Sequence, residues 1–200
     1  MMHSRHLLIC LMSTLTLLVG CATGGELNSD RIRQTFGSYG VEVLLQDERR
    51  RISSLYSGSG DQTITRTYAV VDYLDRPSPE WVADHERIVA GASIGATFRQ
   101  SGWEIEKQHL FIGELEVPPA YGDIGRLMRI DLPATLATHQ YLFVIHREGR
   151  SADYARITEI HHPDYLSATD LRGLYGEILF DDSNRDSIHD FIGPPPGIEQ

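Results

Sequence analysis

The sequence has 200 residues, of which 41% are hydrophobic and 23% are charged. This length and composition are typical of one globular domain and exclude both an intrinsically disordered chain and a bundle of membrane spans. Acidic residues outnumber basic residues by 28 to 18, and the resulting net charge of -10 excludes a nucleic acid as the expected partner.

The N-terminus contains an uncharged apolar stretch after a basic start. Residues 7–20 read LLICLMSTLTLLVG. As a helix this stretch would span about 21 Å, which is shorter than the roughly 30 Å hydrocarbon core of a membrane. Residues 1–20 are therefore expected to be a secretory signal peptide rather than a membrane span.

The segment Leu18-Val19-Gly20-Cys21 ends this stretch and resembles the lipobox of bacterial lipoproteins. The resemblance covers residues 1–21 only. It implies cleavage before Cys21, a diacylglyceryl thioether on the Cys21 sulfur and acylation of the new amino group, with palmitate-type chains that together anchor the protein firmly. Position 22 is Ala rather than the Asp that retains such proteins at the inner membrane. The resemblance therefore implies the periplasmic face of the outer membrane.

The cysteine count bears on disulfides, and the composition indicates how the rest of the chain is divided into segments. Cys10 would leave with the signal peptide and Cys21 would carry lipid, so the mature domain has to fold without a disulfide. Residues 21–29 are expected to be the lipidated N-terminus and a linker. Residues 30–180 are expected to form a single globular domain, and residues 181–200, rich in Asp and Pro, a loose tail.

The expected fold class is α+β, with a mostly antiparallel sheet. Alternating or β-branched stretches predict strands at residues 41–45, 52–56, 63–73, 103–106, 109–117, 139–147 and 152–161. Short helices are expected at 30–36 and at 167–175, the second ended by Gly176, and residues 120–135 are expected to be irregular or briefly helical.

One long packing helix is expected at residues 79–100. Ser78-Pro79-Glu80 has the residue types that favour a helix start, and apolar residues then recur at helical spacing. Gly91 and Gly95 would let one face of this helix approach a sheet closely.

The clearest hairpin joins 139–147 to 152–161. With its turn centred on Gly149 and Arg150, opposed residue numbers would sum to 299, which pairs Gln140 with Glu159. The core face would then consist of Tyr141, Phe143, Ile145, Tyr154 and Ile160.

Four residues near the end of this hairpin are candidate metal ligands or acid–base groups: Glu159, His161, His162 and Asp164. Imidazole and carboxylate groups in one short segment can ligate zinc or a similar transition metal, with His139 or His146 from the neighbouring strand completing the set. His139 and His146 are seven residues apart, so on a regular strand only one of them can join. The structural alternative is a strand end whose His and Asp side chains bond the loop backbone.

Two further patterns each allow a functional and a structural interpretation. Gly91-Ala92-Ser93-Ile94-Gly95 matches the G-x-S-x-G pattern of serine hydrolases, but an elbow of that kind requires a buried strand before the serine, and the preceding stretch predicts a helix. Small-residue packing is therefore the preferred interpretation. Arg49-Arg50-Arg51 could bind anions, but Asp47 and Glu48 beside it favour a solvated turn.

The sequence therefore predicts a lipid-anchored envelope protein facing the periplasm, with a non-catalytic domain that binds an envelope protein or small ligand or has a structural role. No catalytic residue and no cofactor is predicted. The alternative is an envelope metal-dependent hydrolase or metal-binding protein that uses the segment 159–164.

Overall fold

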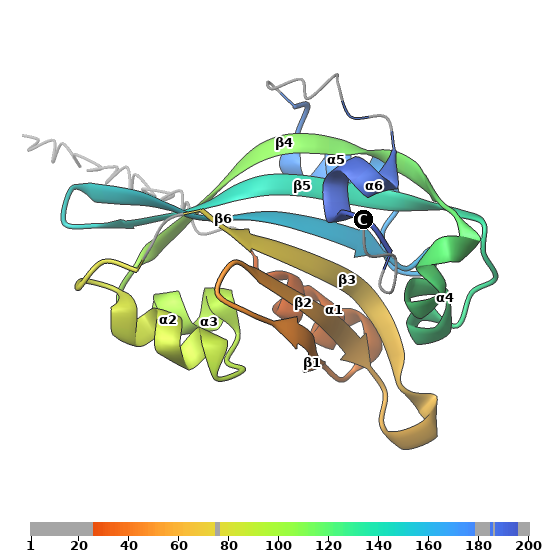
Figure 1. Ribbon diagram of the computed structural model, residues 1–200, viewed down its shortest axis with the longest axis horizontal. Coiled ribbons are helices and arrows are strands. Elements are labelled where there is room, and N and C mark those ends of the chain that lie inside the picture. The colour runs from red at the N-terminus through yellow and green to blue at the C-terminus, as the bar shows by residue number, and fades with distance from the viewer. Residues whose placement is uncertain (1–25, 75–76, 179–184, 186, 196–200) are drawn as a thin grey trace, which may run out of the picture.

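The computed structural model describes residues 26–74, 77–178, 185 and 187–195. Its centre is a six-stranded antiparallel sheet in the order β1-β2-β3-β6-β5-β4 (Figure 1). The strands are β1 (Gly40–Gln46), β2 (Arg50–Ser57), β3 (Ile64–Tyr73), β4 (Glu104–Val117), β5 (Ala134–Arg147) and β6 (Arg150–His161). The expected α+β class is thus confirmed. The lipobox lies outside the described residues.

Within the described ranges, six α-helices and two short 3-10 segments join and cover these strands. The helices are α1 (Asn28–Phe36), α2 (Val82–Val89), α3 (Ile94–Gln100), α4 (Gly122–Met128), α5 (Ala168–Tyr175) and α6 (Ile188–Ile192), and the 3-10 segments are Gly60–Gln62 and Pro119–Tyr121. None of the helices in the described ranges is long and apolar enough to cross a membrane.

The helices divide between the two faces of the sheet, because side chains alternate along each strand. In Figure 1, α6 lies in front of β5 and α5 lies behind it. We call the face toward α4 and α6 the opposite face. It carries an apolar cluster that includes Tyr68, Val70, Leu136, Ile160 and Phe191.

The other face, called the site face below, has two apolar clusters with polar residues between them. One cluster lies under α2 and α3 and contains Val71, Trp81, Phe98, Phe143 and Tyr154. The other lies at α5 and contains Ile112, Ala137, Leu166 and Leu171. The polar residues between the two clusters make the candidate site.

The expected long helix at 79–100 is wrong in one respect, because the chain forms two helices, α2 and α3, with a turn between them. Gly91 has a φ of 107° in this turn, a conformation that a continuous helix does not allow. Arg51 holds the turn by donating to the carbonyls of Ile88 and Ala92. Gly95 does allow close packing, since a Cβ there would lie 2.7 Å from Leu27.

Arg51 also corrects the expected solvated arginine turn. Asp47 does accept from the backbone of the turn, through the N–H groups of Arg49 and Arg50. Arg51, however, is buried on the site face, where its guanidinium also donates to Ser53. Arg51 is buried rather than solvated because β2 begins at Arg50, so Arg51 is already part of the strand and its side chain points to the site face.

The hairpin register differs from the expected one. The turn is centred on Glu148 and Gly149, both with positive φ, which is the two-residue loop that suits twisted antiparallel strands. A bulge at Phe143/Val144 then shifts the pairing, and His139, rather than Gln140, lies opposite Glu159. Ile160 consequently lies on the opposite face, away from the rest of the expected core face.

Two boundaries also change. The expected strands 103–106 and 109–117 are one strand, β4, with a bulge between His109 and Phe111. Polar residues do not interrupt it because β4 lies at the edge of the sheet. The expectation of a loose tail at 181–200 is wrong for α6, whose side chains Ile188, Phe191 and Ile192 are buried. Residues 181–184, 186 and 196–200 lie outside the described residues.

Candidate metal centre

Two neighbouring strands place three ligand-type side chains on the site face. His139 of β5 lies directly opposite Glu159 of β6, and His161 lies two residues further along β6. Because residues two apart on a strand share a face, all three side chains converge. We call them the His-Glu-His cluster. Their exposed fractions are 0%, 4% and 1%, so the cluster is closed to bulk water.

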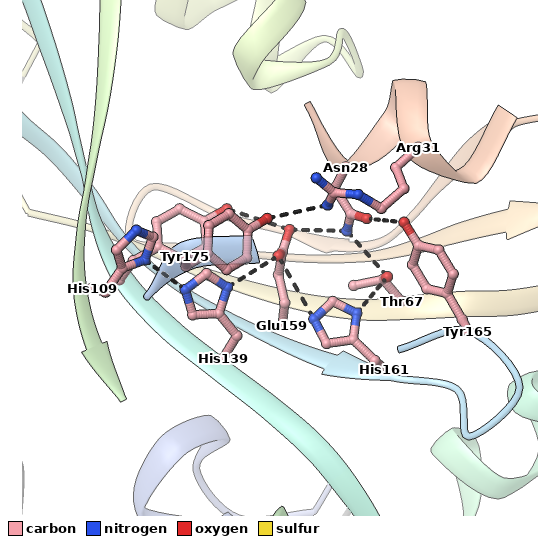
Figure 2. A network of polar contacts seen from close by, with 10 residues as sticks. Asn28, Arg31, Thr67, His109, His139, Glu159, His161, Tyr165 and Tyr175 are labelled. Carbon is pink, nitrogen blue, oxygen red and sulfur yellow. Dashed lines mark hydrogen bonds and ion pairs between the residues drawn. The ribbon is translucent and has the colours of Figure 1, made fainter. Parts of the chain in front are cut away.

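The two imidazoles approach the same carboxylate oxygen. His139 Nδ1 and His161 Nε2 are each 3.9 Å from Glu159 Oε2. Figure 2 shows the two rings on either side of the carboxylate. One ligand atom from each of the three residues lies within 4.8 Å of the others.

The outer nitrogen of each imidazole is held by a neighbour. His139 Nε2 is 2.8 Å from His109 Nδ1, and His161 Nδ1 is 3.1 Å from Thr67 Oγ1. When these outer nitrogens carry the protons, the inner nitrogens present lone pairs toward Glu159. Partners of this kind orient histidine ligands in metal sites.

Glu159 is held by its other oxygen. Its Oε1 accepts from Asn28 Nδ2 at 3.2 Å and from the Tyr141 hydroxyl at 3.3 Å. The Tyr165 hydroxyl donates to Asn28 Oδ1 at 2.7 Å, which fixes the amide so that Nδ2 faces Glu159 and Thr67. These bonds leave Oε2 directed toward the two imidazoles.

Burial keeps the imidazoles neutral near pH 7. Burial lowers the pKa of His161 to about 4, against an opposing effect of Glu159. Burial, reinforced by Lys107 and the neighbouring histidines, also lowers the pKa of His139 well below its ordinary value. The 3.9 Å contacts are therefore not ion pairs, and both rings are in the neutral form that metals bind.

Aromatic rings and one cation enclose the outer side of the cluster. The Tyr175 ring of α5 stacks on His139 and His109, with ring centroids 4.7 and 4.8 Å apart. Lys107 Nζ lies 4.4 Å from the centre of the Tyr141 ring. Burial, then Lys107, lowers the pKa of His109 as well, so the chain His109–His139 carries no positive charge at neutral pH.

The inner nitrogens are the unusual feature of the site. Within the described part of the chain, His139 Nδ1 and His161 Nε2 are buried and make no hydrogen bond. A separation of 3.9 Å exceeds the 2.7–3.2 Å of an N–H···O hydrogen bond. Leaving a buried polar atom unpaired costs about 1–3 kcal/mol. Two such atoms beside a carboxylate are the arrangement that a bound cation would satisfy.

A transition metal fits this donor set. Two neutral imidazoles and one carboxylate form a three-ligand zinc set of the kind found in catalytic sites, which complete their coordination with water or substrate. Tetrahedral bonds of about 2.0–2.1 Å would place ligand atoms roughly 3.3 Å apart, so each His–Glu pair would close by about half an ångström. Side-chain rotation can supply that movement.

A cavity lies next to the cluster on the site face. Its volume is about 90 Å³, and Glu159, Tyr141, Asn28 and Lys107 are among its lining residues. His139 and His161 do not line it. Of the three cluster residues, only Glu159 therefore belongs to the cavity wall.

Two of the four predicted ligands are in the cluster and two are not. His162 points elsewhere, donating from Nε2 to the Met128 carbonyl and accepting the Asp164 N–H at Nδ1. The Asp164 side chain is 80% exposed. The structural alternative is thus correct for His162, whereas Asp164 contributes its backbone N–H rather than its side chain. His139 completes the set, whereas His146 is bonded to Glu106 near the hairpin end.

Ser93 is not at a nucleophile elbow. It is the N-cap position of α3 and follows α2, so no strand leads into it. It lies at the cavity wall with Gly95 and Ile94. The preference for small-residue packing agrees with this position.

Sequence reasoning missed His109 and Asn28. His109 was placed correctly in a strand, but its neighbour on β5 depends on the bulge in β4. Asn28 was expected in the linker 21–29, yet it is the first residue of α1 and is 131 positions from Glu159 along the chain. No local pattern connects residues so far apart.

Comparisons with protein-family models and with curated proteins found no match for this chain. The functional argument therefore depends on the geometry of the His-Glu-His cluster.

Proposed function

We propose that this protein is a lipid-anchored envelope protein whose periplasmic domain binds one divalent transition metal ion at His139, Glu159 and His161. The observation that carries the proposal is the pair of buried, unbonded imidazole nitrogens facing one carboxylate oxygen. A divalent ion would give both nitrogens a partner and would supply the positive charge that the buried carboxylate lacks.

Zinc is the ion that we expect. Imidazole suits zinc, copper, iron and nickel, whereas an all-oxygen set would suit magnesium or calcium. Zinc also has no strong geometric preference of its own, which suits a site with three protein ligands. His109, Thr67 and Asn28 would hold the ligands in orientation from outside.

The site favours holding an ion over hydrolysis. A hydrolytic metal needs an open position that a substrate can reach. Here the imidazoles are fully buried and do not line the cavity, so Glu159 is the one residue of the cluster that reaches it. The domain is therefore proposed as a binding module rather than a metal-dependent hydrolase.

The experiment is elemental analysis of the full chain, extracted from bacterial membranes in non-ionic detergent and carrying a tag without histidine. The expected result is about one equivalent of zinc-type metal in the unaltered protein, with metal lost in Glu159→Gln and His161→Asn. His162→Gln is the matched control, because His162 is also buried and adjacent but faces the Met128 carbonyl.

Titration of the metal-free protein with Zn²⁺ gives a second readout that does not depend on metal acquired in the cell. Zinc should bind the unaltered protein and the His162→Gln control at least a hundredfold more tightly than it binds Glu159→Gln. Equal affinity in all proteins, or no uptake of zinc by the unaltered one, would refute the metal site. Circular dichroism of each variant shows whether it has folded.

The anchor is a separate proposal with its own support. Leu18-Val19-Gly20-Cys21 resembles a lipobox, and Ala22 favours the outer membrane. We expect radiolabelled palmitate to enter the protein and Cys21→Ser to release it from the membrane fraction. Membrane association that survives Cys21→Ser would contradict the anchor and leave the metal proposal untouched.

A further inference from the structure

The cavity beside the cluster has apolar walls. It lies on the site face between the start of α1, the start of α3 and the middle of the sheet. Its apolar lining residues include Leu27, Val41, Leu55, Val71, Ile94 and Ile157. Strands and helices that are far apart in the sequence thus enclose one apolar space.

The cavity also has two cationic residues in its lining, Arg51 and Lys107. Arg51 is buried and donates to Ser53 and to the carbonyls of Ile88 and Ala92. Lys107 is the only lysine of the sequence. Within the described residues it makes no hydrogen bond or ion pair, and its ammonium group lies over the rings of Tyr141 and Tyr175.

The single carboxylate in the lining does not neutralise Lys107. The Oε1 atom of Glu159 accepts from Asn28 and Tyr141, and its Oε2 atom faces the two imidazoles. The cavity therefore combines apolar walls, a cation without an anionic partner and a buried arginine. In a protein with a net charge of -10, this local positive charge is a departure from the overall balance.

We propose that the cavity binds a small monocarboxylate with a short apolar chain. The carboxylate would bind the Lys107 ammonium, and the chain would lie against the aliphatic walls. An amine of the same length would add a third positive charge beside those of Lys107 and Arg51, and a neutral alcohol would leave Lys107 without an anionic partner. The inference does not depend on the proposed metal, because Lys107 and the walls are outside the His-Glu-His cluster.

The size of the cavity sets the length of the chain. A volume of about 90 Å³ is less than that of the ~150 Å³ cavity that accommodates benzene. The enclosed space therefore suits a chain of about four carbons, and longer chains would have to extend through the mouth. Affinity should rise with chain length and level off once the enclosed part is filled.

The test is calorimetric titration of the full chain in non-ionic detergent with butyrate, hexanoate, butylamine and butanol. EDTA is present throughout, so that the result does not depend on the metal site. Butyrate and hexanoate are expected to bind at least tenfold more tightly than butanol, with no binding of butylamine. Equal binding of butyrate and butanol would overturn the proposal, as would the absence of carboxylate binding.

Two variants and a control locate the ligand. Lys107→Gln should weaken butyrate binding at least tenfold, and Leu55→Trp should abolish it by filling the cavity from its half-buried wall. Arg126→Gln removes a positive charge from the exposed surface of α4 and should leave binding unchanged. Butyrate affinity that is the same in Lys107→Gln and Arg126→Gln would show that the cation in the cavity is not the binding group.

Discussion

At the centre of the β5–β6 pair, the two faces of the sheet bond their buried polar side chains in different ways, although the same strands supply both. On the opposite face, Gln140 of β5 donates to Thr158 of β6, and Thr158 donates to the Phe191 carbonyl of α6. On the site face, His139 and Glu159 occupy the neighbouring positions of the same strands, and two imidazole nitrogens have no partner among the described residues.

This difference separates architecture from function within one hairpin. The opposite face surrounds its polar pair with apolar residues such as Ile160 and Leu136, and each side-chain group of the pair is bonded. A buried polar group without a partner lowers stability, so a fold retains it only at a position where something else is gained. The site face therefore identifies the position where a ligand would complete the structure.

The largest expected effect comes from adjacent residues on the two faces. Ile160→Ala leaves a cavity in the opposite-face cluster and should lower the free energy of unfolding by about 2–5 kcal/mol, while zinc binding is kept. His161→Asn should have the converse effect, with zinc binding lost and little change in the stability of the metal-free protein. Chemical denaturation and zinc titration of both variants measure the contrast. If Ile160→Ala abolished zinc binding in the folded protein, the two faces would not be independent.

Zinc itself should stabilise the protein through the site face. At a free zinc concentration one hundred times the Kd, the free energy of unfolding should rise by about 2.7 kcal/mol. The shift should vanish in Glu159→Gln and persist in Thr158→Val, which alters the opposite face of the same strand. Thermal unfolding with and without zinc provides the measurement. A zinc shift that survives Glu159→Gln would place the ion elsewhere.

Acidification should destabilise the metal-free protein through the same histidines. The imidazole pKa is about 6.5 in an unfolded chain, and burial lowers that of His161 to about 4 in the folded protein. Between these values the unfolded chain binds more protons, so the free energy of unfolding falls as the pH falls. His161 alone should account for a loss of about 2 kcal/mol between pH 7 and pH 5.

Denaturation in EDTA at pH 5, 6 and 7 tests this dependence. In His161→Asn the free energy of unfolding should depend less on pH. In the control His146→Gln, which changes a histidine at the turn end of the hairpin, the dependence should be the same as in the unaltered protein. The burial that lowers the pKa of His139 adds to the dependence in the unaltered protein. A curve of unchanged slope in His161→Asn would contradict the assignment.

The smallest effect compares the two covering helices. Ser167 caps α5, and its hydroxyl accepts the Asp170 N–H, so Ser167→Ala should lower stability by about 1 kcal/mol. Because α5 carries Tyr175 against His139, zinc affinity should also fall several-fold. Ser187→Ala, before α6 on the opposite face, should change stability only. Zinc titration of both variants distinguishes a local effect of α5 from a general loss of stability.

The sequence predicts those parts of the fold that depend on neighbours along the chain. The alternation in β1, β2 and β3 and the Ser167 and Gly176 ends of α5 are visible in short windows, because strand faces and helix caps are local properties. Glu159 and His161 could be identified together for the same reason, since side chains that are two positions apart on a strand share a face. The sequence around Gly91 could not predict the break between α2 and α3, because the guanidinium that holds the turn comes from Arg51 on β2.

The tertiary structure alone decided which histidine joins Glu159. Pairing between strands depends on the turn at Glu148 and Gly149 and on the bulge at Phe143/Val144, and a shift of one residue exchanges His139 for Gln140. Asn28, His109 and Lys107 come to the site from other elements, over distances in the chain that no local pattern records. The sequence by itself therefore determined the α+β class and placed two candidate ligands, Glu159 and His161, on one strand. The convergence of the ligands required the folded sheet, because cross-strand contacts are set by hydrogen bonding between distant segments.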